Sequence, residues 1–284
     1  MELDQLRHFR AVAEAGNVTR AAERVGLSQP ALSRSVGRLE AELGQPLFER
    51  QPRGVVLTDA GRRALDRARA ILLMADDLRA DLADDGETGT VRVAAIPTVA
   101  PYFLPGRLRA FHRAFPRARV VVTEEPTRDL VRRVADGDAD VGVAALPVTA
   151  RHVDVEPLFE EELLLVTAAA HPLARKKVVR AADLAGLPFV LLGEAHCLSD
   201  AVVGYCRQRA FQPVSVERTT QLATVQELVA LGHGVSLVPA MARARDAGRG
   251  RAYRSLAGPK PTRTVVMLSN PYRYRSLLAR RFQE

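Results

Sequence analysis

Two cysteines, Cys197 and Cys206, lie nine positions apart and are the only cysteines in the chain. Ser199 can cap a helix that starts at Asp200, which would leave Cys197 just outside a helix N-terminus. The partial positive charge of that terminus favours a thiolate over a thiol, and a protonated His196 would add to the effect. We therefore expect Cys197 to be the reactive thiol of the pair.

The second cysteine, Cys206, falls on the apolar side of the same predicted helix with Val202 and Tyr205, so we expect a buried, unreactive thiol. If the intervening residues are helical, the two Cα atoms lie at least ~10 Å apart. A disulfide tolerates at most ~7 Å, so part of the helix would have to melt first. Gly204 weakens the helix by ~1 kcal/mol relative to alanine. These features predict a redox switch in which peroxide converts Cys197 to a sulfenic acid and Cys206 resolves it to a disulfide.

Other uses of two cysteines are open at this point. Two thiols in an intracellular domain are usually packing residues. No second pair of Cys or His lies at the spacing of a zinc site, so we expect no metal and no cofactor. A thiol peroxidase would also use a reactive thiol, but it leaves the first 60 residues unexplained. We therefore expect that the chain is not an enzyme.

The first 58 residues have the pattern of three short helices and a small hairpin. The second helix, 17–26, carries adjacent small residues and ends at Gly26. Ser28 and Pro30 suit the first turn of a third helix, which Gly44 stops. The segment 46–57 holds a proline and a glycine between extended residues and predicts a wing. This order is typical of a winged helix-turn-helix, and a three-helix protein-interaction module is the alternative.

The exposed side of the third helix would carry polar side chains that suit DNA. Gln pairs with adenine and Arg with guanine at base edges, whereas other polar groups contact phosphates. The residues predicted to contact bases are Gln29, Ser33, Arg34 and Arg38. Pro30 belongs to the first turn of the same helix. The residues better placed to contact phosphates or the minor groove are Ser28, Arg50 and Arg53.

A long helix is predicted to follow, with Thr58 as its N-cap and its end near Ala83. One side of this helix carries a row of apolar residues that needs a partner surface, so we expect a dimerisation helix. The alternative is that the helix packs on its own domain. The predicted seam residues are Leu65, Ala68, Leu72, Ala75 and Leu82, with Ile71 and Leu78 beside them. Residues 84–89 form a polar hinge.

From Thr90 onward strands alternate with helices, which predicts a largely parallel sheet and two small α/β lobes with a cleft between them. The expected domains are a DNA-binding domain at 1–58, a linker at 59–89 and a regulatory domain at 90–284. Within the regulatory domain, lobe I spans about 90–161 and 266–284, and lobe II about 162–265. A solute-binding protein also fits the lobes but cannot account for the helix-turn-helix.

Charge and hydropathy bear on which partners and which cellular compartment we expect for the protein. The net charge is +8, but the segment 243–284 holds 11 basic and 2 acidic residues, so the rest of the chain carries one net negative charge. The excess of positive charge lies outside the predicted DNA-binding domain and is therefore no evidence for DNA binding. A solvent-exposed basic surface near the C-terminus explains it equally well. No apolar run approaches the ~18 residues of a membrane span, and residues 1–6 lack a secretory signal. We expect a cytoplasmic protein with no membrane partner.

Several blocks of the first 60 residues resemble LysR-type transcriptional regulators in order and spacing. The blocks are Asp4–Phe9, Asn17–Ala22, Leu27–Ser33, Leu39–Gly44 and Leu47–Arg50. The resemblance implies a winged helix-turn-helix, a linker helix that pairs two subunits, and a periplasmic-binding-protein-like effector domain. It also implies double-stranded promoter DNA and RNA polymerase as partners, with a homodimer assembling into a homotetramer. In most members a small molecule binds the cleft between the lobes, and this is the alternative function.

The regulatory domain resembles the hydrogen-peroxide-sensing branch of that family, through the blocks Ile96–Pro105 and His196–Leu198 and through Asp200, Gly204 and Cys206. The resemblance implies an oxidative-stress regulator, activator or repressor, in which Cys197 is peroxidatic and Cys206 resolving. The implied peroxide-pocket residues are Thr98, Thr127, His196, Arg263 and Asp200. Ser199 departs from the branch, whose best-known members carry Arg there.

Overall fold

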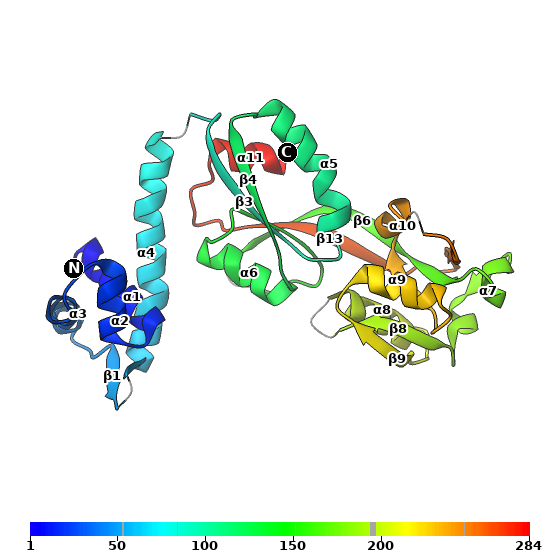
Figure 1. The fold of residues 1–284 in the computed structure, drawn as a ribbon, viewed down its shortest axis with the longest axis horizontal. Helices are drawn as coiled ribbons and strands as arrows, with labels where there is room; N and C mark the ends of the chain where they lie inside the picture. Colours follow the sequence, from blue (N-terminus) through cyan, green and yellow to red (C-terminus); the bar gives the residue numbers. More distant parts are fainter. Residues whose placement is uncertain (53, 84, 151, 194–196, 247) are drawn as a thin grey trace. The chain divides into compact units, whose positions relative to one another are not determined.

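The computed structural model describes residues 1–52, 54–83, 85–150, 152–193, 197–246 and 248–284, with the backbone alone at 80, 81, 83 and 216–218. The chain forms two compact units (Figure 1). Unit 1 comprises Met1–Ala83 with Tyr272–Tyr274, and unit 2 comprises Asp84–Pro271 with Arg275–Glu284. Each unit has its own hydrophobic cores.

Unit 1 begins with three helices, α1 (Leu3–Ala15), α2 (Val18–Val25) and α3 (Gln29–Leu43). Local caps define their ends. The Asn17 side chain accepts hydrogen bonds from the backbone at the start of α2, and Ser28 accepts one from Ala31 N at the start of α3. Gly26 and Gly44 adopt the left-handed conformation that ends α2 and α3. The predicted helix-turn-helix is confirmed.

The wing is an antiparallel hairpin of β1 (Phe48–Gln51) and β2 (Gly54–Leu57). The Glu40 carboxylate, on α3, accepts hydrogen bonds from Leu47 N at 2.7 Å and Phe48 N at 3.2 Å, which ties the recognition helix to the start of the wing. The Phe48 ring packs edge-on against Phe9 of α1, with centroids 5.3 Å apart. A Cβ at Gly54 would lie 2.3 Å from Gly16 O, so only glycine allows this approach of the wing to α1.

The long helix α4 (Asp59–Ala83) starts where the sequence predicts, because Thr58 Oγ1 accepts a hydrogen bond from Gly61 N at 2.9 Å. The predicted partner seam needs correction in part, because three of its residues are buried whereas Leu82 is exposed. Leu65, Ala68 and Leu72 are buried in the core that α4 shares with α1 and α3. The exposed stripe consists of Leu82 from the predicted seam, Ile71 and Leu78 from beside it, and Met74, which was not predicted. A long helix can carry two apolar faces, and periodicity alone does not say which of them its own domain covers.

Unit 2 is built on a seven-stranded sheet in the order β10-β6-β13-β5-β3-β4, with β11 also paired to β6. Its strands are β3 (Gly89–Ala95), β4 (Ala118–Glu124), β5 (Val141–Ala145), β6 (Asp154–Ala168), β10 (Ser236–Pro239), β11 (Arg251–Arg254) and β13 (Thr262–Ser269). The prediction of a largely parallel sheet needs correction. Only β4 and β5 lie parallel to β3, whereas the pairs β13–β5, β13–β6, β10–β6 and β11–β6 are antiparallel.

The two-lobed arrangement is confirmed. Lobe I packs α5 (Ala100–Ala114), α6 (Thr127–Asp136) and α11 (Leu277–Gln283) on β3, β4 and β5. Lobe II contains α7 (Pro172–Arg175), β7 (Val179–Arg180), the 3₁₀ helix η1 (Ala181–Leu184), β8 (Pro188–Leu192), α8 (Cys197–Gln208), β9 (Val214–Thr219), α9 (Leu222–Ala230), α10 (Ala240–Ala244) and β12 (Leu256–Ala257). The long strands β6 and β13 run from one lobe into the other (Figure 1). Within the described ranges, no helix is both long and apolar enough to cross a membrane.

Candidate functional site

The recognition helix α3 separates a buried side from an exposed one. Leu32, Ser35, Val36 and Leu39 are buried against the rest of unit 1. The side chains predicted to reach DNA lie on the other side: Gln29, Pro30, Arg34 and Arg38 are exposed and Ser33 is half-buried. Among the described residues, neither Arg34 nor Arg38 forms an ion pair. Both guanidinium groups are therefore available to a partner.

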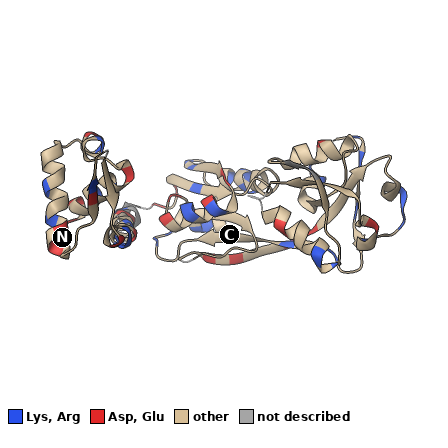
Figure 2. Ribbon diagram, turned by 90° about the horizontal axis from the view of Figure 1, so that it is seen from below, with Lys and Arg blue, Asp and Glu red and all other residues tan. Residues whose placement is uncertain are grey.

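The predicted phosphate-contacting residues lie at the two ends of this surface. Ser28 is exposed at the start of α3, where its side chain also caps the helix. Arg50 is exposed on β1 of the wing. Arg53 lies outside the described residues. Lys and Arg are spread over both units and mixed with Asp and Glu (Figure 2), so the recognition helix is distinguished by its side chains and not by net charge.

Cys197 is the first residue of α8 and is half-buried. It packs against the core of lobe I, which contains Ile96 and Val99, although α8 itself belongs to lobe II. The thiol therefore lies where the two lobes meet. The prediction that Ser199 caps a helix starting at Asp200 is wrong, because α8 begins two residues before Ser199.

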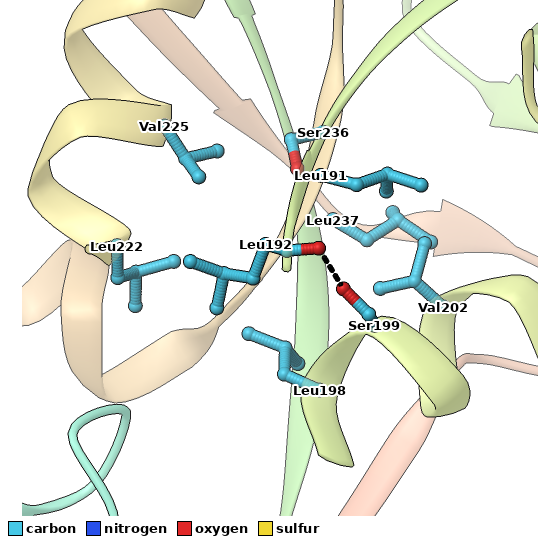
Figure 3. Close-up of a pocket in the computed structure, with 9 residues that line it drawn as sticks. All are labelled: Leu191, Leu192, Leu198, Ser199, Val202, Leu222, Val225, Ser236 and Leu237. Atoms are coloured by element: carbon cyan, nitrogen blue, oxygen red, sulfur yellow. Dashed lines mark hydrogen bonds between the residues drawn. The ribbon is translucent and has the colours of Figure 1, made fainter. Parts of the chain in front are cut away.

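Ser199 instead holds the first turn of α8 against lobe II. Its buried hydroxyl donates a hydrogen bond of 2.5 Å to Leu192 O at the end of β8 (Figure 3). A small cavity of about 10 Å³ lies beside this bond, lined mostly by leucine and valine side chains of α8, α9, β8 and β10. This volume is roughly that of one water and far below that of a metabolite pocket. Where the best-known members of the peroxide-sensing branch carry an arginine, this chain has a serine whose short side chain binds the backbone carbonyl of Leu192.

Cys206 is fully buried in the core of lobe II, as the sequence predicts. Burial raises the pKa of its thiol to about 11. The group therefore stays protonated and shielded while α8 is folded. Any reaction of Cys206 with a partner at Cys197 requires this core to open.

The two thiols lie at separate positions of one continuous helix, and the described residues contain no disulfide. Nine residue steps at 1.5 Å each separate their Cα atoms by about 13 Å along the helix axis. This is nearly twice the ~7 Å limit for a disulfide. Between them, a Cβ at Gly204 would meet nothing within 4 Å, so no packing explains a glycine that weakens the helix.

Thr98 and Arg263 contact each other at the interface of the lobes. Thr98 lies in the turn after β3 and Arg263 on β13, and both side chains are buried. Arg263 Nη1 donates to Thr98 Oγ1 at 2.9 Å, and Arg263 Nη2 donates to Thr98 O at 3.0 Å. The guanidinium is also paired with Glu161 at 2.7 Å. Sequence reasoning missed Glu161, because only the strand register places it opposite Arg263.

Thr127 is brought to the same edge of the sheet as Thr98. Each residue follows the carboxyl end of one of two adjacent parallel strands, β3 and β4, and Glu125 N donates to Ala95 O at 3.1 Å between those ends. Such edges are where open α/β sheets bind ligands. The buried Thr127 Oγ1 has no hydrogen-bond partner among the described residues. Asp200 is exposed in the first turn of α8, and His196 lies outside the described residues.

A winged helix-turn-helix attached to a two-lobed α/β domain defines a DNA-binding regulator with a sensor domain. The comparisons with known proteins agree with this class. Residues 3–62 match the family model described as "Bacterial regulatory helix-turn-helix protein, lysR family", and residues 84–284 match "LysR substrate binding domain". The chain belongs to the LysR family of transcription regulators.

Its curated relatives include hydrogen-peroxide regulators. The chain is 35% identical over 277 residues to the DNA-binding transcriptional dual regulator OxyR of Escherichia coli strain K12, covering 95% of this chain and 90% of that protein. It is 39% identical over 270 residues to a probable hydrogen peroxide-inducible genes activator of Streptomyces viridosporus, covering 93% and 86%.

Solved structures extend the likeness to the fold. A full-length OxyR variant from Pseudomonas aeruginosa has 30% identity and a TM-score of 0.78, covering all of this chain and 95% of that one. An H₂O₂-bound OxyR mutant of Corynebacterium glutamicum has 33% identity and a TM-score of 0.65, covering 99% and 91%. Full-length CbnR complexed with its target DNA has 30% identity and a TM-score of 0.62, covering 100% and 97%.

Proposed function

We propose that this regulator senses hydrogen peroxide through reversible oxidation of Cys197 and controls oxidative-stress genes. The observation that carries the proposal is the placement of two thiols on one helix in opposite environments. Cys197 begins α8 at the lobe interface and is partly exposed, whereas Cys206 is buried in lobe II. The names of two relatives, the dual regulator OxyR and a probable hydrogen peroxide-inducible genes activator, support the same interpretation.

The proposed chemistry has two balanced steps. The Cys197 thiolate attacks one peroxide oxygen, the O–O bond breaks, and the leaving hydroxide takes a proton to become water while sulfur becomes a sulfenic acid. The Cys206 thiol then attacks that sulfur, and the disulfide forms with loss of a second water. A cellular thiol reductant would restore the two thiols. A thiol peroxidase would run the same cycle but would leave the helix-turn-helix of unit 1 without a role, so we propose a sensor.

The pocket residues are assigned roles within this scheme. Thr98 and Thr127 supply hydroxyl groups at the carboxyl ends of β3 and β4, where peroxide would bind. Arg263 holds Thr98 in place. His196 and Asp200 complete the proposed set, and Asp200 is exposed in the first turn of α8.

Disulfide formation would change the shape of the sensor domain. With the Cα atoms about 13 Å apart along α8, the helix must unwind before the sulfurs can join. Unwinding would release the Ser199–Leu192 bond and the hydrogen bond of 3.1 Å from Tyr205 Oη to Pro259 O. The segment after Pro259 leads into β13, which runs through both lobes, so lobe I would also respond.

The DNA-binding end would act as a homodimer on promoter DNA. We propose that the exposed stripe of α4 pairs two subunits, that two dimers form a homotetramer, and that the bound protein contacts RNA polymerase in the cytoplasm. The stripe is largely exposed in the single chain, with Leu78 61% and Leu82 82% exposed. The CbnR structure complexed with its target DNA supports the DNA-bound form.

Arg34→Ala is expected to weaken specific DNA binding. If Arg34 contacts a guanine, the loss should be ~1–3 kcal/mol and confined to one base pair of the site. Binding titrations against a set of singly mutated operators measure it. Arg113→Ala, an exposed arginine of α5, serves as control and should bind as the wild type does. A loss that is equal for all operators would instead assign Arg34 to a phosphate.

Gly204→Ala is expected to hinder the switch. The methyl group meets no neighbour, so it should stabilise α8 by ~1 kcal/mol through helix propensity alone. Stabilising the reduced form raises the reduction potential of the disulfide by about 20 mV. At a fixed glutathione ratio the disulfide-to-dithiol ratio should fall roughly fivefold.

Quantifying the Cys197–Cys206 linked peptide in glutathione buffers measures this effect. Gly106→Ala is the matched control, because Gly106 lies within α5 and also has open space at its Cβ position. The control should leave the potential unchanged. Equal potentials for Gly204→Ala and the wild type would show that α8 does not unwind in the reaction.

The proposed function as a whole is tested by treating the full-length protein with about one equivalent of hydrogen peroxide. Non-reducing peptide mapping should recover the Cys197–Cys206 linked peptide, and footprints of the reduced and oxidised protein on a candidate promoter should differ. Absence of the linked peptide would favour a regulator that responds to a small molecule between the lobes.

A further inference from the structure

A buried ion pair links the two long strands that join the lobes. Glu161 of β6 lies directly opposite Arg263 of β13 in the antiparallel register. Their side chains are only 8% and 1% exposed. Arg263 Nε donates to Glu161 Oε1 at 2.8 Å, and Nη2 lies 2.7 Å from the same oxygen. A buried guanidinium without its carboxylate would be strongly unfavourable, so Glu161 determines where Arg263 can lie.

The two members of this ion pair also form hydrogen bonds to both lobes. The second carboxylate oxygen of Glu161 accepts a hydrogen bond of 3.2 Å from Met241 N in the first turn of α10. Arg263 in turn binds both the side chain and the carbonyl of Thr98 in lobe I. Glu161 is therefore connected to lobe II by its own oxygen and to lobe I through Arg263.

The direction of the Thr98 hydroxyl follows from this connection. Its oxygen accepts from Arg263 Nη1, so its own hydrogen must point to a different acceptor. Among the described residues no acceptor for that hydrogen is found. Cys197 packs on the core cluster that contains Ile96 and Val99, the close neighbours of Thr98. A peroxide at Cys197 would supply the missing acceptor.

We propose that Glu161 is a positioning residue for peroxide reduction, which acts by fixing Arg263 so that Thr98 donates its hydroxyl hydrogen to the peroxide. This inference rests on the proposed function and adds a residue to it. While the Cys197 sulfur attacks one oxygen and the O–O bond breaks, negative charge develops on the departing oxygen, and the donor stabilises that charge. The oxygen leaves as hydroxide and takes its proton from solvent. Glu161 touches neither the sulfur nor the peroxide.

Glu161→Gln in the full-length protein tests the proposal. The amide is nearly isosteric but removes the charge that holds Arg263. The rate constant for oxidation of Cys197 by hydrogen peroxide should fall by about tenfold or more, because small misplacements of a donor are costly in rate. The rate of alkylation of Cys197 by iodoacetamide should stay unchanged, since that reaction needs no donor to a departing oxygen. A loss of general structure would slow or speed both reactions.

Two further variants sharpen the result. Glu162→Gln is the matched control: Glu162 is the next residue, but it pairs with Lys260 near the surface at 3.0 Å, so both rates should match the wild type. Thr98→Val removes the donor itself, and adding Glu161→Gln to it should cause no additional loss of peroxide rate. If Glu161→Gln does not fold, Glu161→Asp keeps the charge with a shorter reach and should show the same selective loss.

The outcomes separate the two proposals. If the wild-type protein forms no Cys197–Cys206 disulfide with peroxide, the proposed function fails. If the wild type forms it and Glu161→Gln reacts with peroxide at the wild-type rate, only the role of Glu161 is overturned. Additive losses in the Thr98→Val background would likewise show that Glu161 does not act through Thr98.

Discussion

Cys197→Ser is expected to abolish the transcriptional response to hydrogen peroxide while leaving DNA binding by the reduced protein intact. Serine replaces sulfur by oxygen with little change of volume, so α8 and the lobe interface should persist. The hydroxyl is a poor nucleophile toward peroxide, and no sulfenic acid can form. The recognition helix lies in unit 1, and the substitution leaves its residues untouched.

The measurement is a reporter driven by the cognate promoter, together with mapping of the peptides under non-reducing conditions. The wild type should show induction and the linked peptide, and Cys197→Ser should show neither. Cys206→Ser is the informative companion, because it keeps the reactive thiol and removes the resolving one. It should accumulate a sulfenic acid that a dimedone-type probe traps, without any disulfide. An unchanged response in Cys197→Ser would refute the sensor assignment.

Leu78→Glu on α4 is expected to separate the dimer and to lower affinity for the full promoter by roughly 10²- to 10⁴-fold, which is the gain that linked binding sites provide. Leu78 is 61% exposed in the centre of the stripe, between Met74 and Leu82. A carboxylate there would have to be buried against an apolar partner, at a large cost in free energy. Folding of unit 1 should not suffer, because its core uses the other face of α4.

Sedimentation or light scattering gives the oligomeric state of this variant, and titration on one half-site against the full site gives the affinities. The half-site affinity should stay near that of the wild type. Arg62→Glu is the control and should leave the oligomeric state unchanged, since Arg62 is exposed but lies nine residues before Ile71 and so about 180° round the helix from it. A dimeric Leu78→Glu protein with normal promoter binding would exclude this stripe as the pairing surface.

Much of the fold was predictable from local sequence. Caps at Asn17, Ser28 and Thr58 and glycine stops at Gly26 and Gly44 each involve only neighbouring residues, so the helices of unit 1 could be placed before any packing was known. The spacing of the two cysteines is read directly from the sequence, and the buried state of Cys206 could be predicted from helical periodicity.

The tertiary structure alone decided which faces meet. The face of α4 that packs on its own domain, the hydrogen bond from Tyr205 to Pro259 O and the antiparallel return of β13 all depend on residues far apart in the chain. Glu161 and Arg263 are 102 positions apart and become partners only through strand register. Short-range rules determine where elements begin and end, whereas long-range packing determines which side chains they bring together, because many pairings satisfy the same local pattern.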